Sequence, residues 1–302
     1  TDFVGKPISV EDSLEMLLAL KRTAIEHAKL DIGRITHEWS QTEDTADHWI
    51  MDHLGSFFKP TTLEPRDVIL FGFGRIGRLL ARELIVQEGS GHQLRLRAIA
   101  VRSIDVASLH KRASLLKIDS VHGDFPGTIK VDEENLALII NGRPVYFIPA
   151  PDPTKADYTA YGISKALLID NSGAFRDDTA LSKHLEGKGV DKVLLTAPGK
   201  GVPNIVHGVN QNNIGKKDRI ISAASCTTNA ISPVLKVVND HFGIERGHLE
   251  TIHAYTNDQN LVDNMHSKYR RGRAAAMNMV ITETGAGKAV DKCIPGLGEK
   301  LT

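Results

Sequence analysis

Residues 68–77 read Val68-Ile69-Leu70-Phe71-Gly72-Phe73-Gly74-Arg75-Ile76-Gly77, and this stretch decides the fold. An apolar run that ends at a glycine loop and continues into a helix-length segment is typical of the first strand, turn and helix of a dinucleotide-binding domain. Gly72 permits the tight turn, Gly74 lets the backbone approach a pyrophosphate, and Gly77 lets the helix pack on the strand. Because a helix N-terminus also attracts phosphate, the candidate cofactor-binding residues are Gly72, Gly74, Arg75, Ile76 and Gly77, with a ligand-free turn as the alternative.

Short apolar runs alternate with helix-length segments beyond this loop. They lie at Leu96–Val101, Ala166–Ile169, Val193–Leu195 and Ile220–Ser222. Such alternation predicts a parallel sheet with crossover helices. Within residues 136–148 the pair Asn141-Gly142 separates two apolar segments, which predicts a tight hairpin added to the sheet in antiparallel fashion. The fold class is therefore α/β, with a Rossmann-type parallel sheet.

The end of the second apolar run bears on which cofactor the glycine loop would bind. Dinucleotide-binding domains use an acidic residue there to hold the ribose hydroxyls. Here the run ends in Val101-Arg102-Ser103, and the nearest carboxylate is Asp105. Arg102 and Ser103 would instead suit the 2′-phosphate of NADP. The alternative is that Arg102 is an ordinary solvent-exposed residue. NAD and NADP both stay open.

Composition limits the class of protein. The chain has 302 residues, of which 41% are hydrophobic and 25% charged, so it can bury a large core and we expect more than one domain. Thirty-seven basic residues balance thirty-seven acidic ones, which argues against nucleic acid or an anionic membrane as partner. Two cysteines make no disulfide framework, and the apolar run at residues 16–20 is too short for a membrane span or signal peptide. These features predict a cytoplasmic protein.

Residues 1–66 form a separate part of the chain. Apolar residues near helical spacing at 8–30, and the capping pattern Ser40-Gln41-Thr42-Glu43, predict a small hairpin of two α-helices. The proline-bracketed segment Lys59–Pro65 predicts a linker. Histidines at 27, 37, 48 and 53 lack the spacing of a ligand set, so we expect exposed helix histidines and no metal site.

Cys226 and His253 are the candidate catalytic residues. Cys226 lies in the helix-start sequence Ser225–Asn229, ahead of a predicted helix at Thr228–Phe242, and His253 lies in Thr251–Tyr255, which reads as a strand. A helix N-terminus and a nearby imidazolium both favour thiolate at neutral pH. The pair predicts a covalent thiol catalyst, although a packed cysteine and a packed histidine are the common alternative.

Several segments together resemble one known family. The chain resembles the phosphorylating glyceraldehyde-3-phosphate dehydrogenases in Phe71–Arg78, Asp119–Gly123, Asn171–Gly173, Thr196–Pro198, Ser225–Asn229, His253–Thr256 and Thr284–Val290, which occur in the family's order. The resemblance implies an oxidoreductase of glycolysis and gluconeogenesis. Cys226 would form a thiohemiacetal and then a thioester with glyceraldehyde 3-phosphate, with His253 as base, NAD or NADP as hydride acceptor and inorganic phosphate releasing the product.

The same resemblance assigns the remaining site residues. By family position, Ser225, Thr227, Thr256, Arg273, Thr284 and Gly285 bind substrate or attacking phosphate, and Ser172 and Thr196 join the cofactor-binding residues. Where many members have a second hydroxyl two residues after Thr256, this chain has Asp258, and a carboxylate cannot donate to phosphate. The sequence Asn257-Asp258-Gln259 is similar to photosynthetic-type members, which often use NADP.

The resemblance also implies the domain organisation and assembly. We expect a helical extension and linker at 1–66, a dinucleotide-binding domain at 67–225 and the N-terminal part of an α+β catalytic domain at 226–302. The family's catalytic domain continues beyond this match, so we expect the 302-residue chain alone to be inactive and prone to aggregate. The basic loop Tyr269–Arg273 matches one that leans toward a neighbour's cofactor in the family, which implies a homotetramer.

Two other functions fit the same residues. An erythrose-4-phosphate dehydrogenase shares the thiol, the histidine and the Asp-Gln pair, and dependence on inorganic phosphate would separate the two enzymes. A regulatory or scaffold protein would use the N-terminal helices to bind a protein partner and keep the dehydrogenase body as structure.

Overall fold

The computed structural model describes residues 8–23, 30–55, 65–87, 94–282 and 284–302. The chain divides into two compact units, one comprising Thr1–Leu168 with Glu186–Asp191 and the other comprising Ile169–Leu185 with Lys192–Thr302. Among the described residues, no helix has the length and apolar character needed to cross a membrane.

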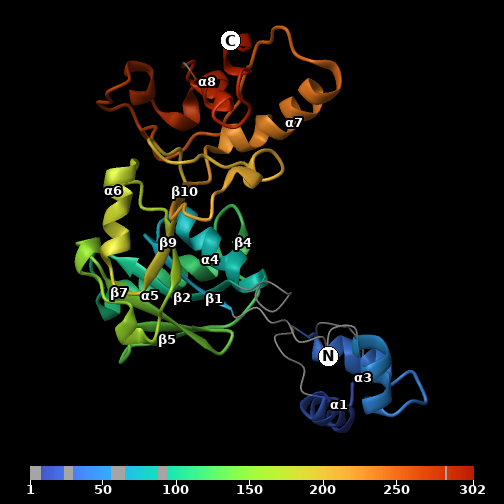
Figure 1. Ribbon diagram of the computed structural model, residues 1–302. Coiled ribbons are helices and arrows are strands. Elements are labelled where there is room, and N and C mark those ends of the chain that lie inside the picture. Colours follow the sequence, from blue (N-terminus) through green and yellow to red (C-terminus); the bar gives the residue numbers. More distant parts are fainter. Residues whose placement is uncertain (1–7, 24–29, 56–64, 88–93, 283) are drawn as a thin grey trace. The chain divides into compact units, whose positions relative to one another are not determined.

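Three short helices form the N-terminal part of the first unit: α1 (Val10–Arg22), α2 (Ile32–Trp39) and α3 (Ala46–Leu54). They pack around one apolar cluster. In Figure 1 these helices are drawn in blue. The buried members of this cluster are Met16, Ala19, Ile35, Trp39, Ala46, Trp49 and Ile50. A few tightly packed large side chains therefore hold three helices of 13 residues or fewer, none of which is long enough to be stable alone.

The prediction of a two-helix hairpin is wrong in the number of helices. The side chain of Asp31 accepts a hydrogen bond from the Arg34 amide and begins α2, and Thr45 does the same for the His48 amide at α3. Ser40 ends α2, so the predicted capping pattern lies in the turn after it. The expected linker Lys59–Pro65 falls, except for Pro65, outside the described residues.

A mostly parallel sheet forms the body of the fold, in the order β10-β9-β8-β1-β2-β7-β6-β5 (Figure 1). Its strands are β1 (Arg66–Phe71), β2 (Leu94–Val101), β5 (Ile129–Asp132), β6 (Ala137–Ile140), β7 (Arg143–Pro149), β8 (Ala166–Asp170), β9 (Val190–Leu195) and β10 (Ile220–Ser222). Strands β1 and β2, β2 and β7, and β9 and β10 pair in parallel, whereas β5, β6 and β7 form an antiparallel meander. The predicted α/β class with a Rossmann-type sheet is confirmed.

The hairpin between β6 and β7 turns at Asn141-Gly142, as the sequence predicts. Their φ angles are +49° and +81°, the left-handed values that a tight primed turn requires and that asparagine and glycine adopt most readily. The Asn141 side chain also accepts a 2.9 Å hydrogen bond from the Thr128 amide and so ties the turn to the start of β5.

Helices and short turns connect these strands or follow the last of them. The helices are α4 (Arg75–Gln87), α5 (Val106–Lys117), α6 (Asp178–Ser182), α7 (Cys226–Phe242) and α8 (Ala286–Asp291), and a two-stranded ribbon joins β3 (Ile118–Asp119) to β4 (Gly123–Asp124). Single 3-10 turns lie at Pro153–Lys155, Thr159–Tyr161, Lys183–Glu186, Gln211–Asn213, Tyr269–Gly272, Ala275–Met277 and Gly298–Lys300.

The predicted strand around His253 is wrong. Residues 251–256 belong to no strand or helix in the described chain, and Ile252 is 99% exposed. A strand exists only where a neighbouring strand pairs with its backbone groups, and the alternation of apolar and polar residues in Thr251–Tyr255 does not supply that neighbour.

Candidate active site

Cys226 is the first residue of α7 and lies at its positive end. Ser225 caps the helix because its hydroxyl accepts a 2.9 Å hydrogen bond from the Thr228 amide. The predicted helix at Thr228–Phe242 therefore begins two residues earlier than expected. Partial positive charge at a helix N-terminus stabilises an anion there, so this position favours the thiolate of Cys226 over the thiol.

A constrained turn places the thiol at this helix end. Ala224 has a φ of +59°, a left-handed conformation that costs a non-glycine residue about 1–2 kcal/mol. Two side chains hold the turn: the Ala224 amide donates to Ser222 Oγ at 3.0 Å, and Asn229 Nδ2 donates to the carbonyls of Ala223 and Ser225 at 2.7 and 2.8 Å. Backbone strain of this kind is retained where surrounding contacts over-determine it.

His253 contacts the thiol directly. Its Nε2 lies 3.4 Å from Cys226 Sγ, and its Nδ1–H donates to the Ala254 carbonyl at 2.6 Å, which leaves Nε2 facing sulfur. The hydrogen bond to His253 lowers the pKa of Cys226. The pKa of His253 is raised, first by its bond to the Ala254 carbonyl and then by the bond to Cys226. Both shifts favour a thiolate beside an imidazolium.

The second cysteine has the opposite surroundings. Cys293 is 4% exposed, packs with Val206 and Ala224, and its thiol donates weakly to the Asn204 carbonyl at 3.6 Å. Burial raises its pKa and keeps it protonated. Both cysteines are free thiols, and Cys226 is exposed whereas Cys293 is buried, so Cys226 is the better placed of the two to react with a molecule from solution.

Of the phosphate-binding residues implied by the resemblance, Ser225 and Thr227 lie next to Cys226, and the others have hydrogen-bond or ion-pair partners elsewhere. Thr227 follows Cys226 in α7, with its hydroxyl 4.0 Å from Sγ, and Gly285 caps α8. Arg273 pairs with Asp263 at 2.8 Å, and Thr284 accepts from the Ala286 amide at 3.2 Å. Among the described residues, no hydrogen bond or ion pair links Thr256, Arg273 or Thr284 to the Cys226–His253 pair.

Asp258, the residue that departs from the family pattern, has a partner. It forms an ion pair with Arg271 of the basic loop, and this hydrogen bond lowers the pKa of the Asp258 carboxyl. Thr256 Oγ1 accepts from the Asp258 amide at 3.4 Å. The negative charge of Asp258 is therefore balanced by the guanidinium of Arg271.

The glycine loop has the geometry that the sequence predicts. Gly72 adopts a φ of +101° at the end of β1, and its amide donates to the Ala100 carbonyl of β2 at 2.9 Å. A Cβ on Gly74 would meet no atom within 4 Å, so the protein's own packing does not require glycine there. Arg75 begins α4, where backbone amides are free to bind phosphate. These residues fit a dinucleotide pyrophosphate.

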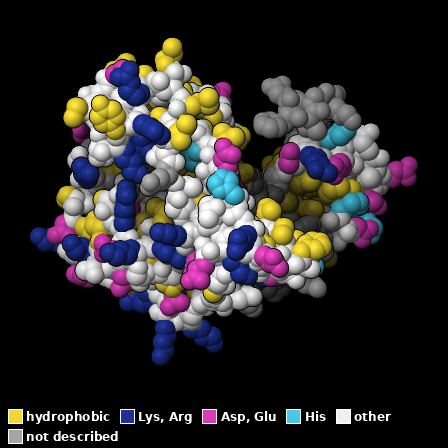
Figure 2. Space-filling model, turned by 90° about the horizontal axis from the view of Figure 1, so that it is seen from above, with side chains coloured by type: hydrophobic (Ala, Val, Ile, Leu, Met, Phe, Trp, Pro, Cys, Tyr) yellow, Lys and Arg dark blue, Asp and Glu magenta, His cyan; other side chains and the backbone are white. Residues whose placement is uncertain are grey.

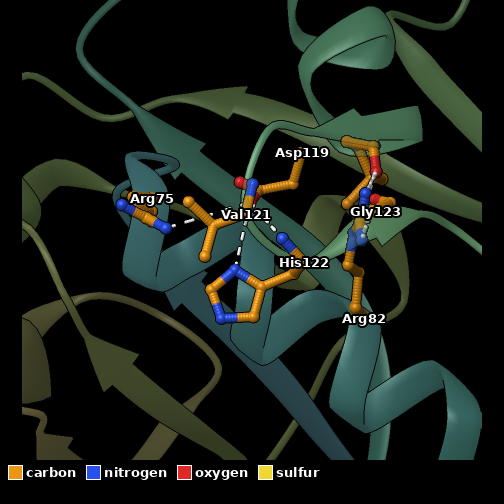
Figure 3. Close-up of polar contacts among 7 residues, drawn as sticks. Arg75, Arg82, Asp119, Val121, His122 and Gly123 are labelled. Carbon is orange, nitrogen blue, oxygen red and sulfur yellow. Dashed lines mark hydrogen bonds and ion pairs between the residues drawn. The ribbon is translucent and has the colours of Figure 1, made fainter.

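Asp119 holds the turn that faces Arg75. Its Oδ1 accepts from the Val121 and His122 amides at 3.0 and 2.9 Å and from His122 Nδ1–H at 3.0 Å. Figure 3 shows Arg75 directed toward this turn, with its guanidinium 3.9 Å from the same oxygen. These bonds, that of the His122 amide first, hold the pKa of Asp119 well below its usual range. The sequence resemblance included this segment without assigning it a role.

Arg82 of α4 fixes both ends of that segment. Its guanidinium donates to the Leu116 carbonyl from Nε and Nη2 at 3.0 and 2.7 Å, and to the Gly123 carbonyl from Nη1 at 2.9 Å (Figure 3). Arg82 is buried, with 8% exposed. The helix that starts in the glycine loop therefore also anchors the ribbon that carries Asp119.

At the end of β2, Arg102 and Ser103 are both exposed. The carboxylate of Asp105 is already engaged, because it caps α5 by accepting from the Ser108 amide at 2.7 Å. This bond lowers the pKa of Asp105. An acidic side chain that binds ribose hydroxyls is thus absent from the first residues that follow β2, residues 102–104.

Ser172 and Thr196 meet at a buried aspartate in the second unit. Asp170 Oδ1 accepts from the Ser172 amide and hydroxyl at 2.8 and 2.7 Å, and the Asp170 carbonyl accepts from the Thr196 amide and hydroxyl at 3.0 and 3.1 Å. The other oxygen of Asp170 lies 2.9 Å from His184 Nε2, also buried. Sequence reasoning missed Asp170 and His184, because nothing local links two residues 14 positions apart.

The face shown in Figure 2 carries side chains of both charges. On the face shown in Figure 2, Lys and Arg side chains stand among Asp and Glu side chains, with hydrophobic side chains between them. This agrees with the balanced composition. Within the described residues, no group of three or more His, Cys, Asp or Glu side chains could hold a metal ion.

The glycine loop at the end of β1 and the capped thiol beside an imidazole define a dinucleotide-fold protein with a reactive cysteine. Two family models match the chain: "Glyceraldehyde 3-phosphate dehydrogenase, NAD binding domain" at residues 66–178 and "Glyceraldehyde 3-phosphate dehydrogenase, C-terminal domain" at residues 225–302. The chain belongs to the glyceraldehyde-3-phosphate dehydrogenase family.

Curated relatives agree with this assignment. A "Glyceraldehyde-3-phosphate dehydrogenase-like protein" of Pseudomonas aeruginosa is 51% identical over 98% of this chain and 65% of its own length. The Thermotoga maritima glyceraldehyde-3-phosphate dehydrogenase is 42% identical over 74% of this chain and 64% of its own length. The chloroplastic enzyme A of Scenedesmus vacuolatus is 41% identical over 76% of this chain and 71% of its own length. The chain thus spans about two thirds of these relatives, and the Pseudomonas match, at 98%, must include the N-terminal helices.

Proposed function

We propose that this chain carries the thiol and cofactor sites of a phosphorylating glyceraldehyde-3-phosphate dehydrogenase, which converts glyceraldehyde 3-phosphate to 1,3-bisphosphoglycerate with NAD or NADP. The observation that carries the proposal is the 3.4 Å contact between Cys226 Sγ and His253 Nε2 at the N-terminus of a capped helix. A thiolate in such a position is a nucleophile suited to aldehydes and thioesters.

The two side chains divide the chemistry. The Cys226 thiolate adds to the aldehyde carbon, and the carbonyl oxygen takes a proton from the His253 imidazolium, which gives a thiohemiacetal. His253 then removes that proton as a hydride leaves the carbon, and a thioester forms on Sγ. Inorganic phosphate attacks the thioester carbonyl and expels the thiolate, which restores the starting pair.

The nicotinamide ring, when bound, accepts the hydride. Gly72, Gly74, Arg75, Ile76 and Gly77 fit the pyrophosphate, as the open space above Gly74 supports. Arg102 and Ser103 would select the adenosine ribose or its 2′-phosphate. Ser172 and Thr196 complete the proposed cofactor residues.

The remaining assignments rest on family position. Ser225, Thr227, Thr256, Arg273, Thr284 and Gly285 are proposed to bind substrate or attacking phosphate. We also propose domain limits of 1–66, 67–225 and 226–302, and a homotetramer as the assembly. The proposed location is the cytoplasm, and the proposed role is in glycolysis and gluconeogenesis. Two free thiols support the location. Relatives bearing the glyceraldehyde-3-phosphate name do not favour erythrose 4-phosphate as substrate.

Thiol protection and turnover test the function separately. Glyceraldehyde 3-phosphate should slow the alkylation of Cys226, as measured by mass spectrometry on the intact chain. Cys293 should stay unmodified whether or not the substrate is present. Where cofactor reduction is observed, it should require Cys226 and inorganic phosphate. Reduction that persists in Cys226→Ser, or substrate that gives Cys226 no protection, would refute the proposal.

A further inference from the structure

Helix α1 carries two apolar faces, although a helix at the surface of a small module needs only one. Met16 and Ala19 are fully buried and contribute to the three-helix cluster. Four further apolar side chains of the same helix are exposed: Val10 at 78%, Leu14 at 56%, Leu17 at 47% and Leu18 at 46%. We call Val10, Leu14, Leu17 and Leu18 the outer stripe.

The outer stripe is continuous along the helix. Its members are spaced at i, i+4, i+7 and i+8, which at about 100° per residue places them on one side, roughly opposite Met16 and Ala19. The module's core is already complete without them, because α2 and α3 cover the inner face. Contiguous exposed apolar side chains with charged neighbours mark an interaction surface.

Charges along α1 indicate which partner covers this surface. Glu11 and Glu15 lie in its first half and Lys21 at its end, all exposed, whereas the basic side chain of Arg22 is already paired with Asp47 of α3 at 2.5–3.0 Å. Two copies of α1 placed antiparallel bring each Glu11 beside the partner's Lys21. A parallel arrangement would put like charges together instead.

We propose that the outer stripe is a self-association surface, in which α1 of one chain packs antiparallel against α1 of a second copy. Leu14 of one copy faces Leu17 of the other, Val10 packs on the stem of the other copy's Lys21, and a Glu11–Lys21 ion pair closes each end. The contact joins the N-terminal modules and is independent of the thiol chemistry. Its short seam makes it reversible and dependent on protein concentration.

Cross-linking of the full chain tests the orientation. In a Cys226→Ser background, Glu11→Cys and Lys21→Cys variants carrying different tags are mixed with a short bis-maleimide. The expected product is a cross-link between Glu11→Cys of one chain and Lys21→Cys of the other. Either variant alone should give little product, because positions 11 and 21 are about 15 Å apart along one helix and the antiparallel arrangement holds two copies of the same position at about that distance. Cross-links of Glu11→Cys to itself would indicate parallel pairing and overturn the proposal. Glu43→Cys, on an exposed turn outside α1, is the matched control.

Charge reversal tests the complementarity by sedimentation velocity. Glu11→Lys and Lys21→Glu should each raise the dissociation constant of the α1 contact about three- to tenfold, and the double variant should restore it. Leu17→Lys should raise it more than about tenfold because two buried leucines are lost per contact. The proposal would be overturned if none of these variants changed the association and no cross-link formed between two α1 helices. The outer stripe would then be covered by another part of the same chain or by another protein.

Discussion

Replacing His253 with glutamine is the most direct test of the catalytic pair. Glutamine keeps a polar side chain near Cys226 but cannot carry a proton between sulfur and an oxygen. The hydrogen bond from His253 is the largest influence that lowers the pKa of Cys226. In His253→Gln that pKa therefore rises, and the fraction of thiolate at neutral pH falls.

Alkylation kinetics measure this change without any need for turnover. The rate of Cys226 alkylation by iodoacetamide follows the thiolate fraction, so it rises with pH through the pKa of the thiol. We expect the whole curve to move to higher pH in His253→Gln, with the same limiting rate at alkaline pH. Where turnover is measurable, loss of a directly contacting base should lower kcat/KM about 10²- to 10⁴-fold, or about 2.7–5.4 kcal/mol of transition-state stabilisation.

The matched control is His248→Gln, which replaces another exposed histidine of the same unit. Its alkylation curve should coincide with that of the wild-type protein. An unchanged curve in His253→Gln would mean that the helix N-terminus alone sets the reactivity of Cys226, and the reasoning about the pair would be wrong.

Three further substitutions probe the supports of the site. Arg82→Met removes the charged hydrogen bonds to the Leu116 and Gly123 carbonyls, so it should lower the free energy of unfolding by about 3–5 kcal/mol. Urea titration measures this change. The control Lys111→Met replaces an exposed side chain and should lower the free energy of unfolding by less than about 0.5 kcal/mol. Asp119→Asn should flatten the acid side of the plot of unfolding free energy against pH. Because the pKa of Asp119 is lowered in the folded protein, its carboxylate stabilises the fold above the ordinary carboxyl pKa, and this stabilisation is lost as the pH falls below that value. An asparagine does not titrate, so the variant lacks this pH-dependent loss. A wild-type-like acid profile in that variant would contradict the assignment. Ser225→Ala removes the N-cap of α7, so it should lower the free energy of unfolding by about 1 kcal/mol and move the alkylation curve of Cys226 to higher pH. Ser40→Ala, at the C-terminal end of α2, should leave that curve in place.

Features set by a few adjacent residues could be predicted from the sequence. The glycine loop and the Asn141-Gly142 turn depend on backbone preferences that one short segment determines, and the start of α7 was predicted to within two residues for the same reason. The three N-terminal helices show the limit of that approach. Both Ser40 and Thr45 are good capping residues, yet Ser40 ends α2 and Thr45 begins α3. Trp39 of α2 and Trp49 of α3 pack into the same cluster as Met16, a contact between segments that the local pattern does not contain.

Contacts between distant segments could not be predicted. Arg82 reaches a carbonyl 41 residues away, and His184 meets Asp170 across 14 residues, with no local pattern that announces either bond. The strand predicted at His253 failed for the same reason, since pairing depends on a partner elsewhere in the chain. The thiol–imidazole contact was predicted because the motifs around both residues resemble one family, and its 3.4 Å distance is a result of the structure.

The way the sheet ends has a consequence for how copies of this chain meet. At one end, β10 is only three residues long, and the segment at Pro203–Ile205 already covers its outer side through two 2.8 Å hydrogen bonds with Ser222. At the other end, β5 is four residues long and carries Lys130 and Asp132. Short, covered or charged margins give little template for a strand from another molecule. Contacts between copies of this chain should therefore seldom arise by adding a strand to this sheet.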